Sequence, residues 1–206
     1  GIRDLIVTGV QTCALPICRN ATAPVRVLDV MIISGLGAML AYHLYPVSGP
    51  KFAFGQYFPN AMLAVDQMSL GPKFNAPAPR NGVPSLHFGW ALALAYLALR
   101  QHRVVAIGFT IFAVLTAIST LSTGHHYLID LVLSWPYMLM AIAIVSHGLP
   151  WTGIRRNALV CGALLYGLWI TAFYTLTAVL AQSTVLIWLA TLTTVAASVY
   201  WLHQLH

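Results

Sequence analysis

The chain has 206 residues, of which 59% are hydrophobic and only 7% are charged, and its formal net charge is +6. A soluble domain carries roughly 25% charged residues, so this composition excludes an ordinary soluble protein and indicates an integral membrane protein. The apolar segments lack the ten-residue alternation of a transmembrane β-barrel. The expected fold class is therefore all-α, a polytopic membrane helix bundle.

The N-terminal segment differs from the rest of the chain. Its stretch Val7–Ile17 resembles the translation of a sequencing-library adapter. We interpret residues 1–18 as a non-native artefact and exclude them from the fold, as an expression tag would be excluded. On this interpretation the native N-terminus, with any upstream helix, is missing. A signal peptide or a seventh helix is the alternative, but four residues interrupt the apolar run: Gly9, Gln11, Thr12 and Pro16.

Residues 19–206 are expected to form one membrane-embedded domain with about six spans, each near the roughly 20 residues that cross a bilayer. The expected spans are Val27–Tyr45, Pro84–Leu99, Val104–Leu121, Leu128–Ser146, Ala158–Ala181 and Val185–Leu202. The second span is short, and its start is expected at the membrane surface. Cys161 lies inside the fifth span, where it serves as a small apolar residue.

The basic residues predict how the helices are oriented. Six arginines fall on one side of the six-helix path: Arg19, Arg26, Arg100, Arg103, Arg155 and Arg156. The positive-inside rule assigns that side to the cytoplasm. Three cations of the long connection 46–83 fall on the other side: Lys51, Lys73 and Arg80. Their gathering predicts a phosphate-binding loop; the alternative is that they contact lipid headgroups or solvate the loop.

The first motif, Pro84-Ser85-Leu86-His87, follows Arg80 closely. Because proline suits the first turn of a helix, Pro84 is expected to open the second span with its free backbone N–H groups facing the same loop. A helix N-terminus beside an arginine is a favourable anion site. A lone histidine such as His87 is more often a hydrogen-bonded structural residue, so its role depends on the second motif.

The second motif is Thr123-Gly124-His125-His126-Tyr127-Leu128-Ile129-Asp130. Gly124 is expected to make a tight turn, and His126 and Asp130 are spaced as neighbours on one helical surface. A carboxylate on one imidazole nitrogen fixes the tautomer and leaves the other nitrogen nucleophilic. His125 would point about 100° away, so we favour His126 and expect His125 to line the site or to bind a headgroup.

These blocks resemble the second and third signature motifs of the type 2 phosphatidic acid phosphatase (PAP2) superfamily, over about residues 25–150, with two further C-terminal helices. Their forms and the Tyr45-Pro46-x-x-Gly49-Pro50 stretch resemble the branch that includes inositol phosphorylceramide synthases. The resemblance implies that His126 attacks phosphorus to give a phosphohistidine, that Asp130 orients it and that His87 protonates the leaving alcohol, with no metal and no cofactor. The expected phosphate-binding residues are Arg80, Ser85, Lys73, Lys51, Gly124 and His125.

The sequence departs from the family pattern at two places. Lys73 and Arg80 have the mutual spacing of the first motif, but Asn81 stands where that motif has a proline. Ser119 and Thr120 stand where the third motif begins with Ser-Arg. One phosphate-binding arginine is therefore absent, as in the synthase-like branch, and its duty is expected to fall on Arg80.

The expected function is a membrane lipid-phosphate phosphatase or phosphotransferase acting at the outer face of a bacterial cytoplasmic membrane. One alternative is synthase-like transfer of a phospho-headgroup to a lipid acceptor. Another is a non-catalytic transporter or scaffold, in which the polar residues form a relay or hold helices together. A vanadium haloperoxidase would share the anion-binding residues, but the continuous spans argue against it. The expected partners are the lipid phosphate substrate and membrane lipids, with no nucleic acid; the sequence identifies no protein partner.

Overall fold

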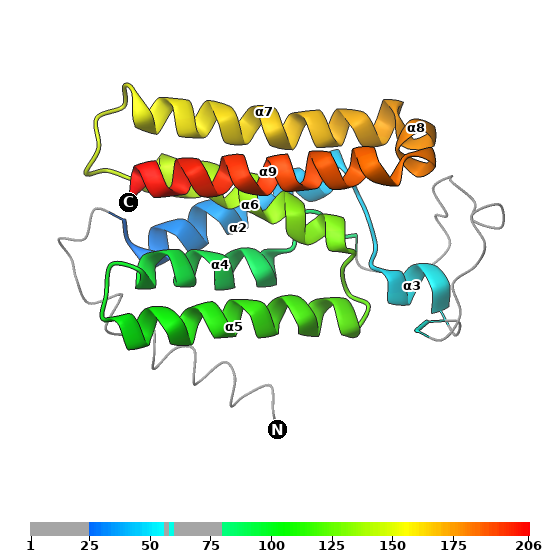
Figure 1. Cartoon of the computed structure of the whole chain (residues 1–206), viewed down its shortest axis with the longest axis horizontal. Coiled ribbons are helices and arrows are strands. Elements are labelled where there is room, and N and C mark those ends of the chain that lie inside the picture. Colours follow the sequence, from blue (N-terminus) through cyan, green and yellow to red (C-terminus); the bar gives the residue numbers. More distant parts are fainter. Residues whose placement is uncertain (1–24, 56–57, 60–79) are drawn as a thin grey trace.

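The computed structural model describes residues 25–55, 58–59 and 80–206, and these residues form a bundle of helices (Figure 1). The helices are α2 (Val27–Leu44), α3 (Pro50–Phe54), α4 (Leu86–Ala98), α5 (Arg103–Ser122), α6 (Leu128–Val145), α7 (Ile154–Thr175), α8 (Thr177–Gln182) and α9 (Thr184–Leu205). In the described ranges, five helices are long and apolar enough to cross a membrane: α2, α5, α6, α7 and α9. The shorter α4 lies alongside them. The expected polytopic helix bundle is confirmed.

Helix α6 is the centre of the bundle. It packs against α2, α4, α7 and α9, and 72% of its span is buried, against 11% of the span of α5. Leu133, Met138 and Ile142 on α6 are fully buried, whereas α5 packs chiefly on α4 and exposes large apolar side chains such as Val114 and Leu115. The second motif therefore stands at the start of the most constrained helix.

Polar side chains join neighbouring helices inside the apolar bundle. The indole N–H of Trp90 on α4 donates to Ser34 Oγ on α2 at 3.0 Å. The indole N–H of Trp169 on α7 donates to Thr194 Oγ1 on α9 at 2.8 Å. Lipid tails offer no hydrogen-bonding partner, so such bonds add to the packing that holds membrane helices together.

The fifth expected span, Ala158–Ala181, differs from the observed helices. Helix α7 begins earlier, at Ile154, and ends at Thr175, after which α8 is a separate short helix. The early start has a physical reason, because Arg155 is buried and its Nε donates to the Ala143 carbonyl at the end of α6 at 2.7 Å. The last carbonyls of a helix lack partners within it, and a basic side chain can donate to them. Arg155 does so for α6, and it therefore lies in the interface between α6 and α7 rather than in the loop before α7. The long spans α2, α5, α6 and α9 agree with expectation to within a few residues.

The helices alternate in direction, so their connections gather at two ends of the bundle (Figure 1). One end holds five of the six arginines expected on the cytoplasmic side: Arg26, Arg100, Arg103, Arg155 and Arg156. Arg19 lies outside the described residues. The opposite end gathers residues 45–50, 80–86 and 122–127, which carry both motifs.

Candidate active site

The turn between α5 and α6 positions the second motif. Gly124 has φ +68°, a conformation that favours glycine, so it makes the expected turn. The backbone N–H groups of His125 and His126 both donate to the Thr120 carbonyl, at 3.2 and 3.3 Å. The turn therefore folds back onto the end of α5, and His126 directly precedes the N-cap of α6.

The structure brings His126 and Asp130 together, but by a different local structure from the one expected. His126 Nδ1 lies 3.4 Å from Asp130 Oδ2, and both side chains are buried. Because His126 precedes α6, the two residues do not share a helical face. Instead Asp130 Oδ2 accepts the backbone N–H of Tyr127, the N-cap of α6, at 2.8 Å. This capping interaction turns the carboxylate back toward His126.

A second acceptor for His126 comes from the connection before α4. The Gly82 carbonyl oxygen lies 3.0 Å from His126 Nδ1. Because a carbonyl only accepts, this contact places the imidazole hydrogen on Nδ1 and the lone pair on Nε2. Gly82 is itself fixed, since its N–H donates to the Val47 carbonyl at 2.8 Å. A Cβ at Gly82 would lie only 2.8 Å from that carbonyl oxygen, so the close approach requires glycine.

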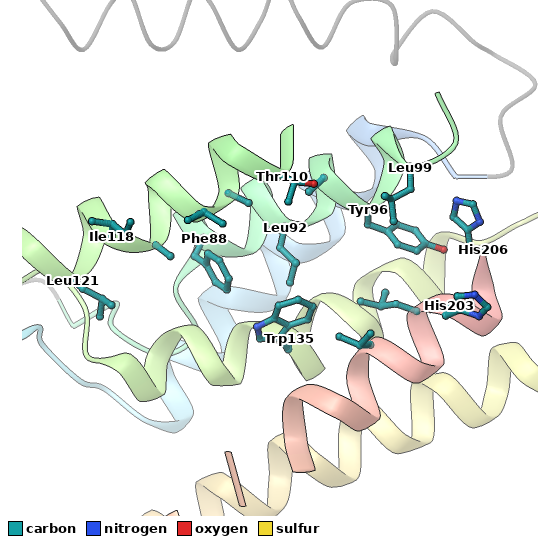
Figure 2. Close-up of a pocket in the computed structure, with 16 residues that line it drawn as sticks. Phe88, Leu92, Tyr96, Leu99, Thr110, Ile118, Leu121, Trp135, His203 and His206 are labelled. Carbon is teal, nitrogen blue, oxygen red and sulfur yellow. The ribbon is translucent and has the colours of Figure 1, made fainter. Parts of the chain in front are cut away.

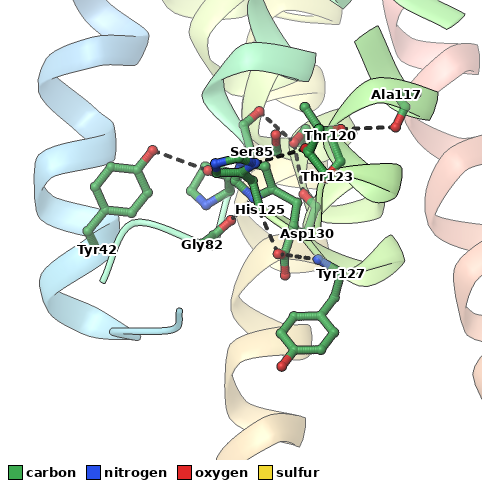
Figure 3. A network of polar contacts seen from close by, with 12 residues as sticks. Tyr42, Gly82, Ser85, Ala117, Thr120, Thr123, His125, Tyr127 and Asp130 are labelled. Atoms are coloured by element: carbon green, nitrogen blue, oxygen red, sulfur yellow. Dashed lines mark hydrogen bonds and ion pairs between the residues drawn. The ribbon is translucent and has the colours of Figure 1, made fainter. Parts of the chain in front are cut away.

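The start of α4 packs directly on the start of α6. The expectation that Pro84 opens this helix is wrong: Ser85 is its N-cap and Leu86 its first residue. The cause is a contact outside the helix, because the Ser85 N–H donates to the Asp130 carbonyl at 3.3 Å. Tyr42 on α2 fixes the same connection through a hydroxyl bond of 3.3 Å to the Pro84 carbonyl (Figure 3).

The polar atoms of this junction are buried to different degrees. Ser134 Oγ lies within hydrogen-bond distance of the carbonyls of Ser85 (3.0 Å) and Asp130 (2.9 Å). Ser85 is fully buried, and within the described ranges Ser85 Oγ and Asp130 Oδ1 have no hydrogen-bond partner. His87, in contrast, is exposed, and its ring centre lies 6.2 Å from that of His126. The two imidazoles therefore lie next to each other at this end of the bundle.

Helix α3, which the sequence did not predict, covers the turn that carries the histidines. The Lys51 N–H donates to the Gly124 carbonyl at 2.8 Å, and a Cβ at Gly49 would clash with the His125 carbonyl. His125 Nδ1 lies 2.8 Å from Thr123 Oγ1. The rings of His125 and Phe52 are T-shaped to each other, with their centres 6.4 Å apart. A Gly-Pro pair at a helix start was the only sequence signal for this contact.

Two of the three cations expected to bind phosphate lie in the described residues. Lys51 is exposed on α3, and Arg80 is exposed at the start of the connection that contains Gly82. Lys73 lies outside the described residues.

Two tyrosines near the site lie outside the membrane-spanning helices. Burial raises the pKa of Tyr45 and of Tyr127, and the Asp130 carboxylate raises both further. Their phenols therefore stay protonated at neutral pH.

The comparisons with known proteins cover this region. A family model described as the PAP2 superfamily matches residues 5–144, which contain both motifs and the connections around them. The matched range begins inside the segment interpreted as an artefact, and that interpretation stays a prediction. Neither the curated proteins nor the solved structures give a match.

Proposed function

The chain belongs to the PAP2 superfamily, and on that basis we propose that it is a lipid-phosphate phosphatase or phosphotransferase with a phosphohistidine intermediate. One observation carries the proposal: His126 Nδ1 contacts two acceptors, Gly82 O at 3.0 Å and Asp130 Oδ2 at 3.4 Å. With Nδ1 held in this way, Nε2 is the nucleophilic atom.

The proposed reaction has two steps. His126 Nε2 attacks phosphorus, the bond from phosphorus to the alcohol oxygen breaks, and His87 gives its proton to the departing oxygen. His87 then takes a proton from water or from an acceptor alcohol, whose oxygen attacks the phosphohistidine. The phosphorus–nitrogen bond breaks and its electron pair returns to Nε2. Asp130 stabilises the positive charge that the imidazole carries in between, as general acid–base and covalent catalysis require.

Water and alcohol are alternative acceptors for the second step. The forms of the two motifs, with Ser119-Thr120 in place of Ser-Arg, resemble the synthase-like branch and favour transfer to a lipid alcohol as the second candidate. The test is to incubate purified protein with a panel of ³²P-labelled lipid phosphates, with and without diacylglycerol or ceramide. Release of labelled phosphate indicates hydrolysis, and a labelled lipid product indicates transfer. If no lipid phosphate is turned over, the transporter or scaffold alternative replaces the proposal.

The site is proposed to face away from the cytoplasm, because the arginines gather at the opposite end of the bundle. Single cysteines at Asn81 and His102, both exposed, are expected to label from opposite sides in a chain freed of its three cysteines. A membrane-impermeant maleimide on intact cells should reach the Asn81→Cys protein alone, and permeabilised cells should label both. Labelling of the His102→Cys protein in intact cells would reverse the orientation.

Arg80 is expected to bind the transferring phosphoryl group, since Thr120 stands where the family pattern has an arginine. Arg80→Ala should slow the chemical step by roughly 10²-fold, the scale of losing one fixed oxyanion donor. Arg80→Lys should recover only part of the rate, because an ammonium cannot reproduce the bidentate fork. Single-turnover rates on equal amounts of folded protein measure both. A parent-like rate for Arg80→Ala would show that Arg80 only anchors the loop.

A further inference from the structure

A long groove runs along the bundle between α5 and α9 (Figure 2). Its volume is about 670 Å³. The floor is the face of α4, where the lining residues recur at helical spacing: Phe88, Leu92, Ala95, Tyr96 and Leu99. One stripe of α5, from Thr110 to Leu121, forms one wall, and Trp135 of α6 with the end of α9 forms the other (Figure 2).

The groove suits hydrocarbon and not a charged group. No Lys, Arg, Asp or Glu side chain lines it, although it lies in a part of the chain that the structure describes completely. The Thr110 hydroxyl donates to the Ala106 carbonyl at 2.8 Å, so its hydrogen already has a partner within α5. The imidazoles of His203 and His206 lie at one end only, beside Tyr96 and Leu99 (Figure 2).

The other end of the groove lies beside the turn that carries His126. It begins at Phe88 on α4 and at Leu121 on α5, and the carbonyl of Thr120, the residue before Leu121, accepts the backbone N–H of His126 at 3.3 Å. From Phe88 to Leu99 the helix rises about 16 Å. This is about half of the roughly 30 Å hydrocarbon core, the depth of one leaflet.

The size of the groove is that of a small-molecule site. Its volume of about 670 Å³ falls in the range of roughly 300–1,000 Å³ found for such sites, and its apolar lining and length suit an extended hydrocarbon chain.

We propose that this groove holds an acyl chain of the lipid phosphate while the phosphate lies between His87 and His126. The proposal rests on the proposed function and deepens it, because it makes the α4–α5–α9 groove a determinant of chain length. An obstacle near Phe88 should reject all long chains, whereas an obstacle near Tyr96 should reject only chains that reach the far end.

The kinetic test uses dihexanoyl and dipalmitoyl phosphatidic acid with two obstructing variants. Ala117→Phe, in the wall near the site, is expected to lower kcat/KM at least tenfold for both lipids. Leu99→Trp, at the far end, is expected to lower it at least tenfold for the dipalmitoyl lipid and less than twofold for the dihexanoyl lipid. The matched control is Ala163→Phe, an exposed position of α7 outside the groove, which should leave both values unchanged. Equal effects of Leu99→Trp on both lipids, or no effect of Ala117→Phe, would overturn the proposal.

A binding test separates failure of the groove from failure of the proposed function. The parent protein in phosphatidylcholine vesicles is irradiated with phosphatidic acid that carries a diazirine near the end of its acyl chain, and the labelled peptides are mapped. Labels on α4, α5 and α9 lining residues, competed by dipalmitoyl phosphatidic acid but not by excess phosphatidylcholine, support the groove even if no ester is cleaved. Labels spread over the exposed faces of α2 and α7, or competed equally by phosphatidylcholine, show bulk lipid contact and overturn it.

Discussion

Replacing His126 with alanine is expected to abolish both turnover and the acid-labile phosphoenzyme, because the substitution removes the nitrogen that is proposed to form the covalent bond. Of the adjacent residues His125 and His126, His126 is the buried one, and its Nδ1 is held by Gly82 and Asp130. Loss of a nucleophile removes the reaction path rather than one stabilising contact, so the expected fall in kcat is larger than that for any other substitution considered above. Rapid-quench measurement with ³²P-labelled lipid phosphate reports both quantities.

His125→Ala is the matched control for this prediction. His125 is the adjacent residue, but it is exposed and its Nδ1 faces Thr123 Oγ1. Turnover and phosphoenzyme should both remain measurable in this variant. Labelled phosphate trapped on the His126→Ala protein would refute the assignment of the nucleophile, and loss of the phosphoenzyme in His125→Ala alone would transfer that role to His125.

Asp130→Ala and Asp130→Asn are expected to differ, because only Asn can still accept the Tyr127 N–H that fixes the start of α6. Where a carboxylate alone fixes the tautomer, its replacement by an amide costs about 10⁴-fold in kcat. Here the Gly82 carbonyl still holds the hydrogen on Nδ1 in the Asn variant. The Asn oxygen can also keep the bond to the Tyr127 N–H that Oδ2 now accepts. We therefore expect Asp130→Asn to lose only about 10²-fold in kcat, and Asp130→Ala about 10⁴-fold.

The measurement is kcat for both variants at equal folded concentration, checked by thermal unfolding in detergent. Adding Gly82→Ala to Asp130→Asn should remove the remaining activity, because the new Cβ displaces the carbonyl that holds Nδ1. If Asp130→Asn loses about 10⁴-fold in kcat, the Gly82 carbonyl does not fix the tautomer.

Apolar length predicted most of the bundle and missed what depends on contacts between helices. The spans α2, α5, α6 and α9 follow from composition, because a run long enough to cross a bilayer has few other stable forms. The early start of α7 depends on Arg155, whose guanidinium donates hydrogen bonds to carbonyls of α6. A hydropathy pattern treats an arginine as a boundary and carries no information about that partner.

The motifs predicted which side chains meet, but not how they are held. The spacing of His126 and Asp130 suggested a shared helical face, whereas the contact comes from the cap of α6. The Gly82 carbonyl could not have been predicted, because a backbone acceptor leaves no chemical signature in the sequence and Gly82 is far from His126 along the chain. The placement of Gly49 against His125 is similar, since close backbone approach is visible only in three dimensions.

The position of Asp130 places a requirement for stability and a proposed requirement for activity on the same residue. Activity and stability often oppose each other, because a functional polar group is buried at a cost to the fold. Here one carboxylate oxygen satisfies a backbone N–H at the start of the central helix and also lies against His126, the proposed nucleophile. Selection for a stable protein and selection for an active one therefore act in the same direction at this residue, and drift through inactive but well-folded intermediates is disfavoured there.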